Sequence, residues 1–218
     1  MRCSGSPMRT GISAVVLAGT AVLAAGPAVA PPAAAIANAW TIRPGGTITA
    51  TAGKTTLTDV SAGSVVPCVS SRMTGTLKPG SGLAGAGIGS VATAAYDRCG
   101  VALFTLRLTP RGLPWRLNLT SYDAHSGAAR GTISGLRLVF SSPEIPCAAV
   151  INGTSSTAAD GVVAVSYANK TGTLRVLPGG GNLHWYHVRS CARVVRTGDP
   201  ATLSASYSIS PRQAITSP

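Results

Sequence analysis

Apolar and polar residues alternate with a period of two along several stretches of this chain. The clearest is ATLSASYSIS, residues 201–210, in which serine and threonine fill the even-numbered positions. Its odd-numbered positions are Ala201, Leu203, Ala205, Tyr207 and Ile209. Side chains alternate between the two faces of a strand, so this pattern predicts a β-strand with one buried face. Residues 101–108, 115–122 and 132–140 alternate similarly, and residues 47–52 are rich in β-branched side chains.

Glycine and proline separate these stretches and predict turns. Residues 162–168 and 173–177, VVAVSYA and TLRVL, flank NKTG and predict a hairpin. After LPGGGN, the stretch LHWYHV (183–188) is expected to continue the meander as a third strand. Many short strands at close spacing are typical of an antiparallel β-sandwich or barrel. The predicted fold class is therefore all-β.

The stretch GNLHWYHVRSC, residues 181–191, holds two of the chain's three histidines. His184 and His187 are three positions apart, so on a regular strand they point to opposite faces. Leu183, Trp185 and His187 are expected on one face of that strand. A β-bulge would realign the histidines, but two diverging side chains do not form a metal site, and none is predicted.

The first 39 residues have the features of a secretion signal peptide. Arg2 and Arg9 precede an apolar run over residues 11–26, and Ala37-Asn38-Ala39 is a small-x-small cleavage site. The run is shorter than the roughly 20 residues that span a bilayer. A secreted chain of residues 40–218 is expected, with no membrane span after cleavage.

Four cysteines follow the signal and predict two disulfides: Cys68, Cys99, Cys147 and Cys191. Three pairings are open, and Cys68 with Cys99 and Cys147 with Cys191 is favoured because each half of the chain runs from a Pro-Cys pair to a second cysteine. The same likeness suggests a possible internal pseudo-repeat, about 40–125 and 126–218, within a single all-β domain. The long spacings and the lack of a C-x-x-C disfavour a metal tetrad.

The chain is strongly basic, with 18 Lys and Arg against 6 Asp and Glu and a formal net charge of +12. Such a charge attracts anionic surfaces, so a cell-wall polymer is one expected partner and another extracellular protein is the alternative. The bases are scattered, with Arg189, Arg193 and Arg196 the nearest to a cluster. Nucleic-acid surfaces group their bases or interleave them with aromatic residues, so no specific nucleic-acid partner is expected.

Candidate chemistry is sparse. Asp123 and His125, in SYDAHSG, stand two apart and suggest a hydrolase, although Asp, Ser and Gly also form ordinary turns. Gly80, Gly82 and Gly85 make a G-x-G-x-x-G without the strand, helix and acid of a dinucleotide site, so a glycine loop is expected and no cofactor.

A surface that stacks on sugar rings needs exposed aromatic side chains. The chain has few aromatic residues, and most of them are expected in the core. The candidates for carbohydrate binding are Trp40, Trp115 and Tyr122.

Longer segments resemble a family of small secreted proteins of Streptomyces and related actinobacteria. They include WTIRPGGTITATAGKTTLTD, GLPWRLNLTSYD, GTISGL, VSYANKTGTL, GGNLHWYHV and GDPATLSASYSISP. The resemblance implies export, an actinobacterial source and the cysteine plan, and it carries no catalytic residue. The expected function is that of a secreted non-enzymatic binding protein, with the Asp123/His125 hydrolase as the alternative.

Overall fold

The structure, a computed structural model, describes residues 39–101, 104–191 and 193–218. Within these residues there is no helix, and the strands close into an eight-stranded antiparallel β-barrel with extra strands. The all-β prediction is therefore confirmed as a barrel. The predicted signal peptide lies, except for Ala39, outside the described residues.

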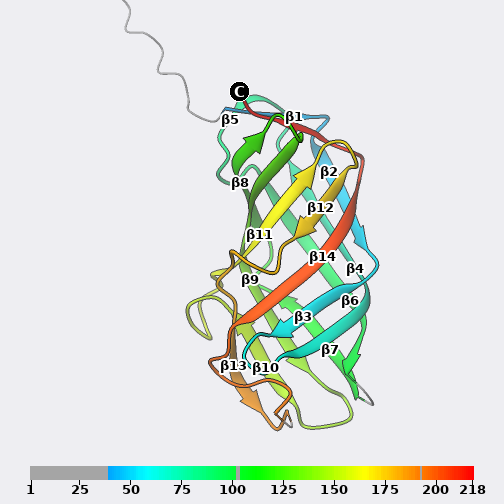
Figure 1. The fold of residues 1–218 in the computed structure, drawn as a ribbon, viewed down its shortest axis with the longest axis vertical. Coiled ribbons are helices and arrows are strands. Elements are labelled where there is room, and N and C mark those ends of the chain that lie inside the picture. Colours follow the sequence, from blue (N-terminus) through cyan, green and yellow to red (C-terminus); the bar gives the residue numbers. More distant parts are fainter. Residues whose placement is uncertain (1–38, 102–103, 192) are drawn as a thin grey trace, which may run out of the picture. The chain divides into compact units, whose positions relative to one another are not determined.

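Long strands run the whole length of the barrel and carry both of its halves (Figure 1). These strands are β4 (Ser64–Leu77), β6 (Gly89–Val101), β9 (Ala128–Ser141) and β14 (Ala201–Ser210). Shorter strands fill the gaps between them, and a different set does so in each half. The upper half is defined here as the end with the C-terminus in Figure 1, and the lower half as the end with β13.

In the upper half the strands close in the order β9-β11-β12-β14-β2-β4-β6-β8 and back to β9. The filling strands here are β2 (Gly46–Ala52), β8 (Trp115–Asp123), β11 (Gly161–Ala168) and β12 (Thr173–Val176). Their register puts β2 between β14 and β4, so segments from the two ends of the chain share one wall.

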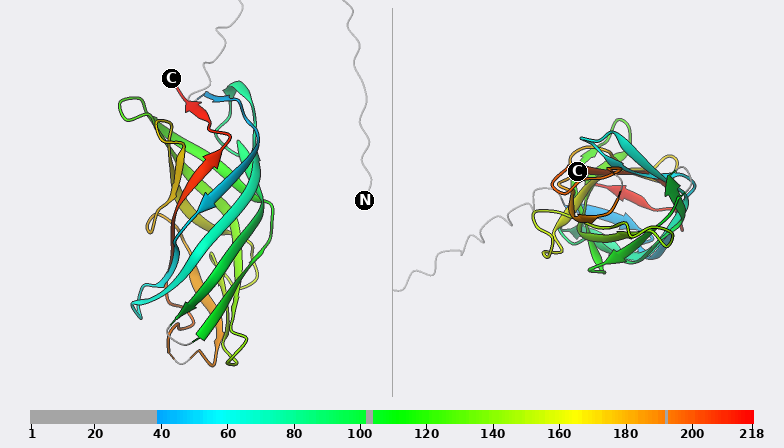
Figure 2. Two further views of the ribbon diagram at one scale, coloured as in Figure 1. Left: turned by 90° about the vertical axis from the view of Figure 1, so that its right-hand side faces the viewer. Right: turned by 90° about the horizontal axis from the view of Figure 1, so that it is seen from below.

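In the lower half the strands follow the order β9, β10 and β13, and β13 is bridged to Pro200, the residue before β14. The start of β14 pairs with β3, and the order continues through β4, β6 and β7 back to β9. The filling strands are β3 (Thr55–Asp59), β7 (Phe104–Arg111), β10 (Ala148–Asn152) and β13 (His184–Arg189). A bridge between His184 and Pro200 closes this circuit. Figure 2 shows the strands inclined to the barrel axis and, from below, the ring that they form.

A small sheet covers the upper end of the barrel. It orders β15 (Ala214–Thr216), β1 (Trp40–Arg43) and β5 (Gly80–Leu83). The side chains of Trp40 and Ile42, both on β1, are fully buried. Gln213 attaches this cap to the wall, because its side chain accepts a hydrogen bond from the Gly45 amide at 2.8 Å and its carbonyl accepts one from the Tyr167 hydroxyl at 2.8 Å.

The barrel interior is a packed core, as the alternation of the strands requires. On β14, Ala201, Leu203, Tyr207 and Ile209 are buried and Ala205 is half-buried, which confirms the inward face predicted for residues 201–210. In the lower half the Phe140 and Trp185 rings meet edge to face with centroids 5.2 Å apart. Apolar burial of this kind contributes about 25 cal/mol per Å² removed from water.

A short polar chain crosses this core where the halves meet. The Thr55 and Ser71 hydroxyls lie 2.6 Å apart, and Ser71 donates to the Tyr207 hydroxyl at 2.9 Å. All three side chains are buried, so the hydrogen bonds offset the cost of removing the hydroxyls from water. Burial also raises the pKa of Tyr207.

Both predicted disulfides are present, and both lie in the lower half. Cys68 and Cys99 are register partners on β4 and β6, with their Cα atoms 3.8 Å apart. Cys147, just before β10, bonds to Cys191, just after β13. Disulfides are typical of oxidising compartments, so this pattern is compatible with an extracellular protein.

Three sequence predictions of local structure need correction. Residues 101–108 are not one strand, because β6 ends at Val101 and β7 begins at Phe104. The glycine loop at residues 80–85 contains strand β5. The hairpin of β11 and β12 is confirmed, but β13 does not continue its meander: β12 pairs with β14, and β13 pairs with β10.

The correction to β13 has a local cause. The segment LPGGGN does not turn back beside β12, because the Leu177 and Asn182 amides donate to Ala164 and Val162 of β11. The chain therefore follows β11 downward and enters the lower half before β13 begins.

None of the described residues forms a helix long and apolar enough to cross a membrane.

Candidate functional site

Strand β4 carries an apolar row on the outer wall of the lower half. Val65 and Val69 are 48% and 52% exposed, and Pro67 between them is also exposed. Their neighbours Val66 and Cys68 point inward and are buried. Both faces of this segment are thus apolar, although only the inner one is covered by the core, and exposed apolar surface of this kind marks sites of interaction.

The neighbouring strands shape the part of this row that holds Pro67 and Val69 into a groove of about 630 Å³. In the register that pairs Cys68 with Cys99, Val69 lies opposite Arg98 of β6, and Pro67 lies opposite Gly100. Gly100 has no side chain, which leaves the hollow between Pro67 and the start of β7. The lining residues, apart from the disulfide, are Lys54, Pro67, Val69, Arg98, Gly100, Phe104 and Thr105.

Two cationic side chains flank Val69 in this groove. Lys54 immediately precedes Thr55, the register partner of Cys68, and so stands beside Val69 on the β3 side. Arg98 stands on the β6 side and donates from Nε to Asp97 at 3.3 Å. This is the only ion pair among the described residues. The groove therefore joins an apolar floor to a basic rim.

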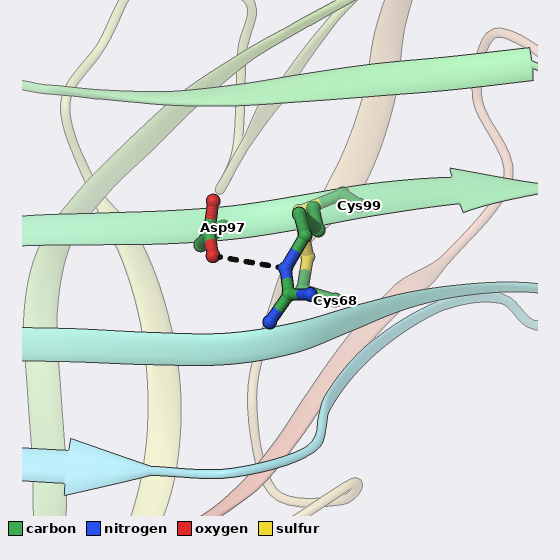
Figure 3. A network of polar contacts seen from close by, with 4 residues as sticks. Cys68, Asp97 and Cys99 are labelled. Carbon is green, nitrogen blue, oxygen red and sulfur yellow. Dashed lines mark hydrogen bonds and ion pairs between the residues drawn. A yellow bond between two sulfur atoms is a disulfide. The ribbon is translucent and has the colours of Figure 1, made fainter.

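Figure 3 shows Asp97 next to the Cys68–Cys99 disulfide, which joins β4 to β6. Arg98 has a φ of 47°, in the left-handed region that residues other than glycine rarely adopt. The surrounding ladder holds Arg98 in this conformation.

The segment SVVPCV was the available signal for this groove. The five residues after Ser64 include no polar side chain, which is typical of a strand that is covered on both faces. The segment was used to predict a disulfide through Cys68, and the exposure of its second apolar face was not predicted.

Asp123 is the last residue of β8, His125 lies in the turn that follows, and both are exposed. The Asp123 carboxylate accepts from the His125 amide at 3.0 Å, the Ser126 amide at 3.3 Å and the Ser126 hydroxyl at 2.6 Å. The Ser126 hydrogen bonds lower the pKa of Asp123. The carboxylate is thus engaged by the backbone of its own turn, and its catalytic use with His125 stays a prediction.

The aromatic candidates for carbohydrate binding lie mostly in the core. Trp40 is 0% and Trp115 is 1% exposed, so neither presents a ring face to solvent. The Trp115 indole donates to the Arg111 carbonyl at 3.0 Å. Tyr122 is half-buried and packs against the core. Both tryptophans belong to the hydrophobic core.

The two histidines of β13 differ in their surroundings. Trp185 points inward and is fully buried, whereas His184 is half-buried with Nδ1 2.9 Å from the Asn182 carbonyl. His187 has a φ of 51° and is exposed, so the expected shared face of Trp185 and His187 is wrong: the ladder with β10 is irregular at this point. In the part of the chain that the structure describes, no group of three or more His, Cys, Asp or Glu residues is placed to hold a metal ion.

A pair of carboxyl groups was missed by the sequence reasoning. Asp59 is 1% exposed and accepts hydrogen bonds from the Ala62 amide at 2.8 Å and the Arg196 amide at 3.2 Å. Asp199 lies close by, with a buried Oδ2 that has no hydrogen-bond partner. Burial, and then the charge of Asp59, raise the pKa of Asp199. No local pattern relates residues so far apart in sequence.

The apolar cavity in the upper half of the barrel is small. The upper half encloses an apolar cavity of about 30 Å³, lined in part by Leu77, Leu119 and Val165. Pockets that hold small molecules usually measure about 300–1,000 Å³. This cavity is too small for an apolar ligand, whereas the groove on the outer wall has the volume for one.

The chain was compared with known protein families, with curated proteins and with solved structures. The family described as "Alkane oxidation protein activator PraA/PraB-like" matches residues 10–216. No curated protein matches the chain, and no solved structure matches it. The family's description names an activator of alkane oxidation. Since the match covers nearly all of the sequence, the chain belongs to the PraA/PraB-like family of alkane oxidation protein activators.

Proposed function

We propose that this protein is an exported, non-catalytic accessory protein of alkane oxidation that holds apolar chains against its outer groove. The exposed row of Val65, Pro67 and Val69 is the observation that carries the proposal. An accessory protein for a water-insoluble substrate needs surface that gains free energy by contact with it. Burying exposed aliphatic side chains supplies such a gain, at about 25 cal/mol per Å².

The proposal is supported by the way the barrel divides its apolar residues. The apolar cavity in the upper half measures only about 30 Å³, so an alkane is not expected to be carried there. The two disulfides secure the lower half, where the groove lies, and so maintain its shape outside the cell. The groove then presents apolar surface of fixed geometry on the outer wall.

The test is complementation of an alkane-oxidising culture that lacks this chain. Added wild-type protein should restore oxidation of hexadecane. Val69→Ser should require about five times more protein, because it removes about 1 kcal/mol of apolar burial. Val60→Ser is the matched control: Val60 is also 52% exposed but does not line the groove. Undiminished hexadecane oxidation in the culture without the protein would refute an accessory role.

A second candidate function is binding of an anionic envelope polymer, and a separate observation favours it. Arg111 of β7 and Arg137 of β9 are register partners, and Arg137 has a buried Nε without a hydrogen-bond partner. Like charges directly opposite each other destabilise a sheet. A bound polyanion would remove this repulsion.

This candidate is tested by sedimentation of the protein with isolated cell walls at low salt and near 0.5 M salt, where screening acts within about 3–10 Å. Arg111→Glu should lower retention several-fold more than Arg175→Glu, which changes an exposed arginine of β12. Equal losses for the two variants would mean that net charge alone accounts for the binding.

A further inference from the structure

The groove on β4 combines two features that an alkane by itself does not need. Its floor is apolar, with Pro67 and Val69 exposed side by side on one face of the strand. Its rim is basic, with Lys54 and Arg98 on either side of Val69. An unsubstituted hydrocarbon would use only the floor, so the rim points to a ligand with a negative charge at one end.

The donors on this rim are available. No carboxylate pairs with Lys54 within the described residues, and Arg98 contacts Asp97 through Nε only. The Nη groups of Arg98 make no hydrogen bond to any part of the chain that the structure describes. A guanidinium presents these donors as a fork that matches the two oxygens of a carboxylate. Lys54 adds a flexible ammonium from the opposite side.

We propose that the groove binds a long-chain carboxylate, with the alkyl chain along Pro67, Val69 and Gly100 and the carboxylate between Lys54 and Arg98. The inference rests on the proposed function, because carboxylates are the charged class of products that alkane oxidation yields. The apolar chain supplies most of the affinity. The rim selects the oxidised compound over the alcohol of equal length.

Equilibrium dialysis of the purified protein at 0.15 M salt tests this selection, at ligand concentrations below micelle formation. Dodecanoate and dodecan-1-ol share a chain and differ in charge, whereas butanoate keeps the charge and loses most of the chain. Dodecanoate should bind about three- to tenfold more tightly than dodecan-1-ol, the range expected from two exposed charge contacts. Butanoate should bind much more weakly than either.

Two variants locate the site. Lys54→Glu should weaken dodecanoate about three- to tenfold and leave dodecan-1-ol nearly unchanged. Lys78→Glu, the control, changes an exposed lysine outside the groove and should leave the dodecanoate affinity close to wild type. Val69→Ser should weaken both ligands by similar factors, because it alters the floor that both use.

Several outcomes would overturn the inference. Equal affinity for dodecanoate and dodecan-1-ol would remove the selection for charge while leaving the apolar contact of the proposed function in place. Equal losses for Lys54→Glu and Lys78→Glu would place the site elsewhere. Binding confined to phosphatidylglycerol vesicles would assign the groove to a membrane surface instead. Failure of the proposed function is read independently, from hexadecane oxidation.

Discussion

At the scale of single residues, Asp199 carries an unfavourable charge. Its buried Oδ2 lacks a partner, and burial together with the nearby Asp59 raises its pKa above the ordinary value of 3.8. A carboxyl group with a raised pKa in the folded state stabilises the fold most fully below its unfolded pKa. That contribution is lost as the pH rises through the folded pKa.

Asp199→Asn is therefore expected to raise the thermal transition at pH 7 and to leave it unchanged near pH 3, measured by circular dichroism across this range. Asp123→Asn provides a contrast of opposite sign. The Ser126 hydrogen bonds lower the Asp123 pKa, so its contribution is present at neutral pH and is lost on acidification. A lower transition for Asp199→Asn at pH 7 would contradict the reasoning.

The groove shows what single residues disclose in a sequence and what they do not. Val65 and Val69 are written plainly in SVVPCV, but their exposure depends on which strands flank β4 and on what covers it. Lys54 and Arg98 reach Val69 only through the registers of β3 and β6. Trp40 and Trp115, by contrast, were candidates for carbohydrate binding because they are aromatic, but both are buried in the core.

At the scale of elements, strands with one covered face were the most predictable. The alternation over residues 201–210 matches β14, and residues 115–122 and 47–52 match β8 and β2 to within a residue. In such strands the alternation of apolar and polar residues shows which side chains face the core. The disulfide pairing followed from the likeness of the two halves, although the duplication itself stays a prediction.

The pairing of strands with one another was less predictable. The stretch 183–188 is a strand, but its partner is β10 instead of β12, because backbone hydrogen bonds carry LPGGGN along β11. Likewise, residues 101–108 alternate smoothly across the break between β6 and β7. Periodicity reports the face of a strand, whereas its partner depends on turns and on hydrogen bonds between distant segments.

Close packing of strands also explains glycine positions that alternation cannot. Gly75 of β4 and Gly131 of β9 each lie where a Cβ atom would collide with a backbone carbonyl, those of Ser90 and Asn118 respectively. Irregular register accompanies both positions. Bulges of this kind let a sheet curve enough to close, so these glycines belong to the barrel itself.

At the scale of the whole molecule, the barrel separates stability from binding. The core lies inside the barrel and the cap covers its upper end, whereas the groove and the arginine pair lie on the outer wall. A mutation in the core should then change stability without changing affinity for an apolar chain. Leu77 offers the sharpest test, because it lines the small interior cavity and is 4% exposed.

Leu77→Ala enlarges this cavity and should lower the free energy of unfolding by about 2–5 kcal/mol, measured by urea denaturation. Dodecanoate affinity, measured where the variant is fully folded, should stay at the wild-type value, because the added space opens inward and the groove is outside. Val69→Ser should give the reverse result, with weaker binding and little change in stability. Tighter dodecanoate binding by Leu77→Ala would mean that the chain enters the barrel, and the assignment of the outer groove would fall.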